Sequence, residues 1–349
     1  MAVAMLGRWA AEAPVPVFVA RGGGSGLLAA ELAADRRLVL VASPRHASVL
    51  LAAGRFPAQL GVALDRVHDQ MPRPRRTIWW TADADDHRPP ALGDATVVTG
   101  AGADPVPALV AAHRAACVDH GDGDPDVLAD VAPNDFEGRG DHGQGGEGMM
   151  GGVPYGRPMA MTGDDRDGLA LDELAVVLGP FLAGFPNGLQ VRGVLQGGVV
   201  SQAEPVLVDL GAGPRLDTND LSTPVGRARH DLRWLSDALG LGGLSALGAR
   251  AAALARSGAD AAERQSLSRR VRRSGLARTW AGVGVVDGAD ARDRLERVLG
   301  DPGAERRAPL SPERLGEVLV GQDWADAVVT ICSLGLATDT SVAMSGWAS

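Results

Sequence analysis

The chain of 349 residues contains no lysine, so all 34 of its basic residues are arginine. This absence excludes chemistry that needs a lysine amine, such as a Schiff base. Only two cysteines are present, Cys117 and Cys332. Two thiols are too few for a disulfide framework, and too few to hold a structural zinc ion or an iron–sulfur cluster by themselves. We therefore expect a cytosolic protein without a cluster of its own.

Long apolar runs are also missing. No run reaches the roughly 18 apolar residues that a membrane span needs, and the N-terminus has no basic region ahead of an apolar core. We expect neither a transmembrane segment nor a signal peptide. The net charge of −9 argues against binding to nucleic acid, whose phosphates attract basic surfaces. At roughly 150 residues per domain, the length allows about two globular domains.

The most informative stretch is a glycine-rich loop near the N-terminus. An apolar, β-branched run at 15–20 leads into Gly22, Gly23, Gly24, Ser25 and Gly26, and a helix-forming run at 27–34 follows. A strand, a glycine loop and a helix N-terminus in this order present backbone N–H groups to an anion. The loop is therefore the first candidate for a cofactor-binding site, although lone glycine fingerprints are weakly specific.

Short strands and helices alternate after this loop. The pattern predicts an α/β domain over 13–117, built on a flavodoxin-like, doubly wound parallel sheet, and it leaves 1–12 as an N-terminal segment. The expected strands are 15–20, 38–43, 48–52, 77–80 and 95–99, and the expected helices include 60–70 and 107–116. Trp79 and Trp80 lie in the fourth of these strands, where core packing is the favoured interpretation.

Residues 118–168 are rich in glycine, aspartate and histidine and have little periodicity, which is typical of a flexible linker. His120, His142, Met149 and Met150 lie within it or its tail, and a metal-handling role for them stays open as an alternative. From 169 to 349 the pattern predicts an α+β domain. It has antiparallel strands at 174–178 and 189–200, a helical body at 225–240, 244–257 and 260–274, a helix starting at Ser311, and a strand at 327–334.

The segment 42–80 has Ser43-Pro44-Arg45-His46 before an apolar strand and a helix that ends with Asp69-Gln70-Met71-Pro72. With these features the segment resembles the cluster-bearing small subunit of complex I and membrane-bound nickel–iron hydrogenases. In that family four cysteines bind a [4Fe–4S] cluster. The resemblance places these positions at Gly24, Leu27, Asp83 and Ala101 of this chain, and none of them is cysteine. Because such clusters need thiolates, the resemblance implies that the cluster has been lost.

The second half resembles the hydrogenase-type large subunit and the quinone-site subunit of complex I. The features that carry this are Leu178-Gly179-Pro180-Phe181, a Pro-Asn-Gly-Leu turn at 186–189 and a Gln-Gly-Gly-Val-Val strand at 196–200. The family's terminal nickel-binding cysteine is absent, since 335–337 read Gly-Leu-Ala. The chain thus looks like a fusion of two degenerate subunits without iron–sulfur or nickel cofactors.

The resemblance implies a non-redox structural or coupling subunit of a complex I-like or Mrp-antiporter-like assembly, peripheral on the cytosolic face of the cell membrane. Its partners would be membrane-embedded subunits, and the basic segment Arg264–Arg278 would meet anionic lipid or an acidic partner. An NADPH- or quinone-linked oxidoreductase stays open as an alternative, with Gly24-x-Gly26-x-x-Ala29 on a phosphate and Arg45 on a 2′-phosphate. Asp83, Asp85, Asp86 and His87 are candidates for a residual polar or metal site. We find no set of residues in the sequence that is typical of a catalytic site formed by this chain alone.

Overall fold

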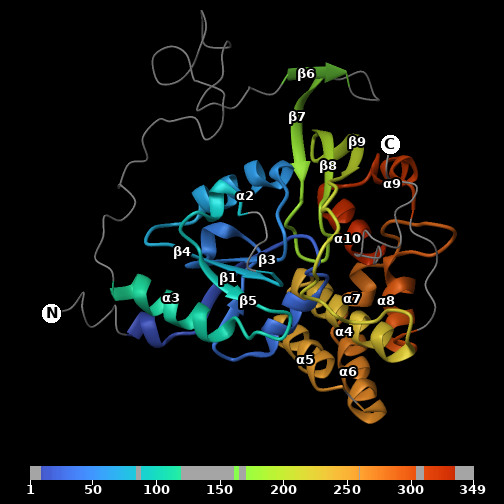
Figure 1. Cartoon of the computed structure of the whole chain (residues 1–349). Coiled ribbons are helices and arrows are strands. Elements are labelled where there is room, and N and C mark those ends of the chain that lie inside the picture. Colours follow the sequence, from blue (N-terminus) through green and yellow to red (C-terminus); the bar gives the residue numbers. More distant parts are fainter. Residues whose placement is uncertain are drawn as a thin grey trace, which may run out of the picture.

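The computed structural model describes residues 9–83, 88–118, 161–164, 170–258, 260–303 and 310–334. In the first half, five strands form a parallel sheet in the order β2-β1-β3-β4-β5 (Figure 1). They are β1 (Val15–Arg21), β2 (Leu38–Leu40), β3 (Val49–Ala53), β4 (Arg76–Thr81) and β5 (Thr96–Thr99). This is the flavodoxin-like strand order, and the predicted α/β fold class is confirmed.

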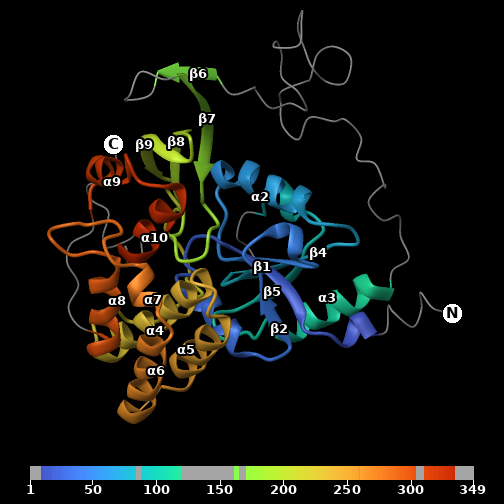
Figure 2. The same cartoon turned by 180° about the vertical axis from the view of Figure 1, so that it is seen from behind.

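Helices cover both faces of this sheet. They are η1 (Leu28–Ala34), η2 (Pro44–His46), α2 (Ala58–Gln70), η3 (Pro90–Leu92) and α3 (Val106–Val118). In β3, Leu50 and Ala52 belong to the apolar cluster under α2, whereas Leu51 and Ala53 belong to the cluster under α3. Since alternate residues of a strand face opposite sides, a strand buried on both faces must be apolar throughout, as β3 is. Figure 2 shows α2 and α3 on opposite sides of the strands.

The second half begins with an antiparallel sheet in the order β6-β7-β8-β9. Its strands are β6 (Met161–Asp164), β7 (Ala170–Leu178), β8 (Leu189–Gln196) and β9 (Val199–Leu207). Gly197 and Gly198, with φ of 55° and 89°, form the tight turn between β8 and β9. The predicted stretch 189–200 is therefore one strand, a turn and the start of the next strand.

A helical body follows the sheet. Its helices are α4 (Pro224–Leu241), α5 (Ser245–Ser257), α6 (Ala261–Arg273), α7 (Leu276–Thr279), α8 (Ala291–Gly300), α9 (Pro312–Leu319) and α10 (Trp324–Leu334). Side-chain caps start several of them: Thr223 caps α4, Asp260 caps α6 and Ser311 caps α9. The start at Ser311 was predicted and is confirmed.

Several of the predicted elements need correction. The predicted linker 118–168 includes strand β6 (Met161–Asp164), and the predicted strand 38–43 is shorter, since β2 ends at Leu40. The stretch 327–334 was expected to be a strand, but it lies inside helix α10, where Ala327, Thr330 and Ile331 are buried at helical spacing. Packing of this face against the core outweighs the β-branched composition. The run after the glycine loop forms a 3₁₀-helix, η1, with an i→i+3 bond from Ala30 N to Leu27 O, and not a regular α-helix.

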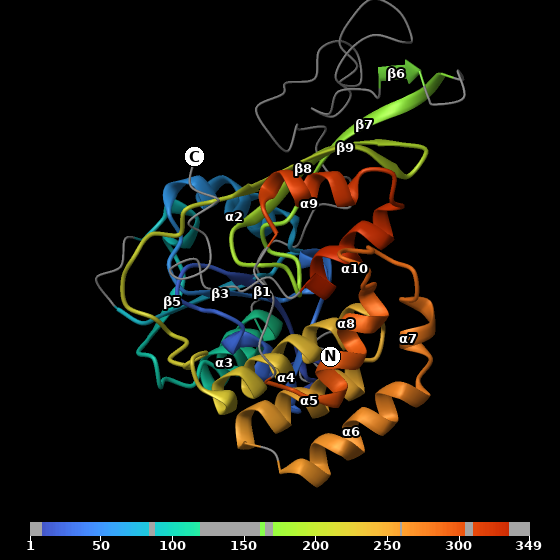
Figure 3. The same cartoon turned by 90° about the vertical axis from the view of Figure 1, so that its right-hand side faces the viewer.

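The two halves share their apolar cores. Leu27, which follows the glycine loop, packs in the cluster of the helical body with Leu235 and Leu239. In the other direction, Phe181 and Leu210 from the second half complete the cluster under α2. Figure 3 shows the helical body lying beside the parallel sheet rather than apart from it. The contact between the halves is therefore partly a hydrophobic core.

Candidate functional site at the glycine loop

The glycine loop leaves the sheet at the carboxyl end of β1, where ligands of open α/β sheets usually bind. Gly24 and Gly26 have φ of 74° and 50°, a left-handed conformation that favours glycine. The loop is also packed closely on its neighbours: a Cβ at Gly23 would lie 2.7 Å from the Leu210 carbonyl oxygen, and one at Gly24 would lie 3.0 Å from that of Pro214. The glycines thus allow the backbone of 208–217 to approach the loop.

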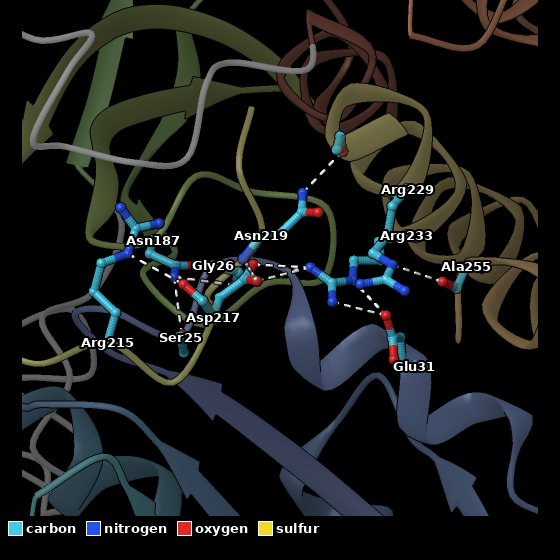
Figure 4. A network of polar contacts seen from close by, with 11 residues as sticks. Ser25, Gly26, Glu31, Asn187, Arg215, Asp217, Asn219, Arg229, Arg233 and Ala255 are labelled. Carbon is cyan, nitrogen blue, oxygen red and sulfur yellow. Dashed lines mark hydrogen bonds and ion pairs between the residues drawn. The ribbon is translucent and has the colours of Figure 1, made fainter. Parts of the chain in front are cut away.

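Asn187 binds this loop from the second half of the chain (Figure 4). It is 2 % exposed, and its amide Nδ2 lies 3.2 Å from Gly22 O, 3.0 Å from Ser25 Oγ and 3.3 Å from Gly26 O. The Ser25 hydroxyl in turn donates to Gly22 O at 2.8 Å. Asn187 Oδ1 has no hydrogen-bond partner among the described residues. One buried amide therefore joins three acceptors of the loop to the turn before β8.

A carboxylate also lies against the loop. The backbone N–H of Asp217 donates to Gly24 O at 2.9 Å, and a Cβ at Gly26 would overlap the Asp217 carboxylate. Arg233 of α4 donates to both carboxylate oxygens of Asp217 at 2.9 Å and lies 2.7 Å from Glu31 Oε1 of η1 (Figure 4). An arginine with two carboxylates in a buried setting forms strong, charge-assisted bonds. This network links η1, the segment before α4 and α4 itself.

Two further arginines join the halves at the same place. Arg21, the last residue of β1, forms a buried ion pair of 2.7 Å with Asp237 of α4. Arg55 donates through Nη2 to Gly211 O at 2.7 Å and through Nη1 to Pro214 O. These contacts, together with those of Asn187 and Asp217, make the loop a joint between the two halves.

The positions that the resemblance assigns to cluster ligands lie in different surroundings. Gly24 contacts the backbone of 214–215, Leu27 is 1 % exposed in the core of the helical body, Asp83 is half-buried after β4, and Ala101 is exposed after β5. Neither cysteine replaces the missing thiolates at these positions. Cys117 lies at the end of α3 beside His113, and Cys332 is fully buried in α10. Burial raises the pKa of both thiols, which disfavours the thiolate form that binds metals.

Arg45, the other predicted cofactor residue, is exposed in η2. η2 leads into β3 at Ser48, whose N–H bonds to Pro16 O near the start of β1. The glycine loop follows Arg21 at the other end of β1, about 16 Å further along a strand. The fold therefore places Arg45 near the amino ends of the strands and the glycine loop at the carboxyl ends.

The other candidate residues are only partly described. Asp85, Asp86 and His87, and the linker residues His120, His142, Met149 and Met150, lie outside the described residues. In the part of the chain that the structure describes, no group of three His, Cys, Asp or Glu side chains is placed to hold a metal ion. Trp79 and Trp80 are buried in the two core clusters on opposite faces of the sheet, as core packing requires.

The residues that make the joint were not predicted from the sequence. Asn187 was interpreted only as part of a Pro-Asn-Gly turn, and Asp217 and Arg233 were not singled out at all. Asn is favoured in turns between strands whether its side chain is buried or exposed. The sequence therefore gives no signal that the Asn187 side chain is buried. The pairing of Asp217 with Arg233 depends on how the halves pack, which local patterns do not encode.

Comparison of the chain with protein-family models, with curated proteins and with solved structures finds no match. Among the described helices, none is both long and apolar enough to cross a bilayer. The class of protein is therefore set by the fold alone: an α/β domain with a flavodoxin-like sheet, joined through its glycine loop to an α+β domain.

Proposed function

We propose that this protein is a non-redox structural or coupling subunit of a membrane ion-translocating assembly related to complex I, to the membrane-bound hydrogenases or to Mrp antiporters. The observation that carries the proposal is that the glycine loop contacts the second half of the chain. Its backbone carbonyls and glycine Cα positions contact Asn187, Asp217 and the 210–215 backbone. The loop thus connects the two halves mechanically. It does so at the place where the resemblance puts the [4Fe–4S] cluster.

The sequence supports this function because all four vestigial ligand positions, Gly24, Leu27, Asp83 and Ala101, lack a thiol. The side chain of Leu27 packs with hydrocarbon from α4. In such a subunit the parallel sheet and the helical body move as one unit, because ion pairs and apolar contacts both connect them. Coupling then takes the form of passing a displacement from one partner subunit to another, without electron transfer.

The first test measures iron. Protein purified under anaerobic conditions is expected to contain no stoichiometric iron and to give no electron paramagnetic resonance signal of a reduced [4Fe–4S] cluster, because the chain lacks the thiolates. A stoichiometric cluster would overturn the proposal. As a second arm, NADPH is expected to leave the melting temperature unchanged. A specific NADPH shift would favour the oxidoreductase alternative.

The assembly itself is tested by purification from native membranes in a mild detergent. A tagged chain is expected to bring down multi-span, antiporter-like subunits in fixed stoichiometry. Recovery of the chain alone, under conditions that keep other membrane complexes intact, contradicts the proposal.

A further inference from the structure

Helix α6 has one face in the core and one face covered with arginine. Leu267 and Val271 are buried, and Ser268 donates its hydroxyl to Leu299 O of α8 at 2.8 Å, so this face packs on the helical body. Arg269 and Arg273 lie one turn apart on the opposite face and are exposed, with Arg270 beside them. Arg278 of α7 is exposed as well. We refer to Arg269, Arg270, Arg273 and Arg278 as the arginine stripe.

The acidic residues near α6 are engaged at its flanks. Arg272 pairs with Glu296 of α8 at 2.7 Å, and Arg250 of α5 pairs with Glu263 at 3.1 Å. None of the four residues of the arginine stripe has an acidic partner within the described ranges. Residues 260–279 hold six arginines against two acidic residues, although the chain as a whole has a net charge of −9. The positive charge is therefore concentrated on one surface.

This surface lies at an extremity of the molecule. In Figures 1 and 2, α6 is the lowest helix, and β6 and β7 are at the opposite end. Figure 3 shows α6 again at the outer edge of the helical body. Helix α6, which carries the exposed Arg269, Arg270 and Arg273, can therefore be approached from outside without first meeting the rest of the described chain.

We infer that the arginine stripe docks the protein on an anionic membrane surface, with guanidinium groups on lipid phosphates. Arginine forms bidentate bonds with phosphate, and a juxtamembrane basic cluster gains affinity from each positive charge. A convex, protruding helix face suits a planar lipid surface, whereas an acidic peptide would be held better by a groove. No large apolar side chain is exposed on α6 or α7 in the described residues, so this binding is electrostatic and reversible.

This inference deepens the proposed function, because it says which side of the subunit faces the membrane. With α6 at the lipid surface, the antiparallel sheet of β6 to β9 points away from the membrane (Figure 1). The overall negative charge would then repel the remaining surfaces from anionic lipid, so that only one orientation is favourable.

The test uses the full chain and phosphatidylcholine vesicles with or without phosphatidylglycerol, in a flotation assay. The wild type is expected to float only with the anionic vesicles. Replacement of Arg269, Arg270 and Arg273 by Gln is expected to lower the partition coefficient roughly 100-fold, from roughly fivefold for each charge. Binding is also expected to fall between about 0.01 M and about 1 M salt, as the Debye length shortens from about 30 Å to about 3 Å.

A matched control removes three exposed arginines from the α/β half, by Arg36→Gln, Arg66→Gln and Arg114→Gln. This variant has the same net charge as the stripe variant, and it is expected to bind the anionic vesicles as the wild type does. Both variants change exposed side chains, so circular dichroism and melting temperature are expected to match the wild type and would reveal a folding defect.

Two outcomes would overturn the inference. One is equal loss of vesicle binding in the stripe and control variants, which would make net charge the cause. The other is a wild type that ignores anionic vesicles but binds polyglutamate through Arg269, Arg270 and Arg273, which would assign the stripe to an acidic protein partner. Either result is independent of the iron and NADPH measurements, so a failure here is distinguishable from a failure of the proposed function.

Discussion

Asn187 is the side chain on which the glycine loop depends most directly. Asn187 is 2 % exposed, and its amide faces Gly22 O, Ser25 Oγ and Gly26 O. Removing this buried donor takes one hydrogen bond from each acceptor, although Gly22 O still accepts from the Ser25 hydroxyl. A buried acceptor left without a partner costs more than the bond contributes on formation. The position therefore tests whether the loop is a joint.

Asn187→Ala is expected to lower the free energy of unfolding by roughly 2–3 kcal/mol. Asn187→Asp places a carboxylate against three oxygen atoms, so its pKa rises in the folded state and the variant becomes more stable as the pH falls. Urea unfolding at neutral and acidic pH measures both effects.

The control is Asn219→Ala. Asn219 is half-buried, and its side-chain amide donates to Gly226 O at 2.8 Å, so a smaller loss of about 1 kcal/mol is expected. Equal losses at Asn187 and Asn219 would mean that the loop contacts add nothing beyond an ordinary hydrogen bond.

At the scale of elements, helix α8 offers a prediction about pH. Its N-cap Asp290 accepts hydrogen bonds from Gly282 N at 2.7 Å and Asp293 N at 2.8 Å, and the Asp293 carboxylate accepts from Asp290 N. The Gly282 N–H contributes most to a lowered pKa of Asp290, and the Asp293 N–H adds to it. Both bonds favour the charged form, so protonation weakens the cap.

Asp290→Ala is expected to lower the free energy of unfolding by about 1 kcal/mol at neutral pH. Because the folded pKa lies below the ordinary value of 3.8, this contribution is present above that pH and is lost as the pH falls through the lower folded value. The difference between wild type and variant should therefore shrink in acid. In Asp290→Asn, which cannot titrate, the stability should not have this pH dependence, and an identical acid profile for all three proteins would refute the assignment.

Elements differ in how well the sequence predicts them, and α10 and α9 show why. Helix α9 has an N-cap, Ser311, followed by Pro312, and these local signals act at the helix end itself. Helix α10 has Val328, Val329, Thr330 and Ile331 in succession, which favours a strand by composition. What makes it a helix is the burial of one face against the apolar cluster with Leu189 and Val191, which depends on residues more than a hundred positions away.

At the scale of the whole molecule, the parallel sheet was predictable and the joint was not. The strands β1 to β5 and their parallel sheet follow from alternating apolar strands and helices between breakers, each visible within a short window. The joint needs Asn187, Asp217 and Arg233 to meet residues 21–31, and these contacts form only once the halves have packed. The sequence predicted the glycine loop as a candidate cofactor-binding site, and in the structure the loop contacts Asn187, Asp217 and the backbone of 210–215.

The halves are therefore expected to stay together even when the chain between them is cut. If a specific protease site is inserted within 119–160 and cleaved, the two fragments should co-elute in gel filtration and unfold in a single urea transition. The reason is that Leu27, Phe181 and Leu210 complete apolar clusters across the cut, and Arg233 bridges Asp217 and Glu31. Arg233→Met leaves the buried Asp217 and the partly buried Glu31 without their cation. Removing one partner of a buried ion pair costs roughly 3–5 kcal/mol, so the cleaved variant should separate at lower urea. If the wild-type fragments elute apart without denaturant, the contacts at the glycine loop do not hold the two halves together. That result would contradict the proposed coupling function.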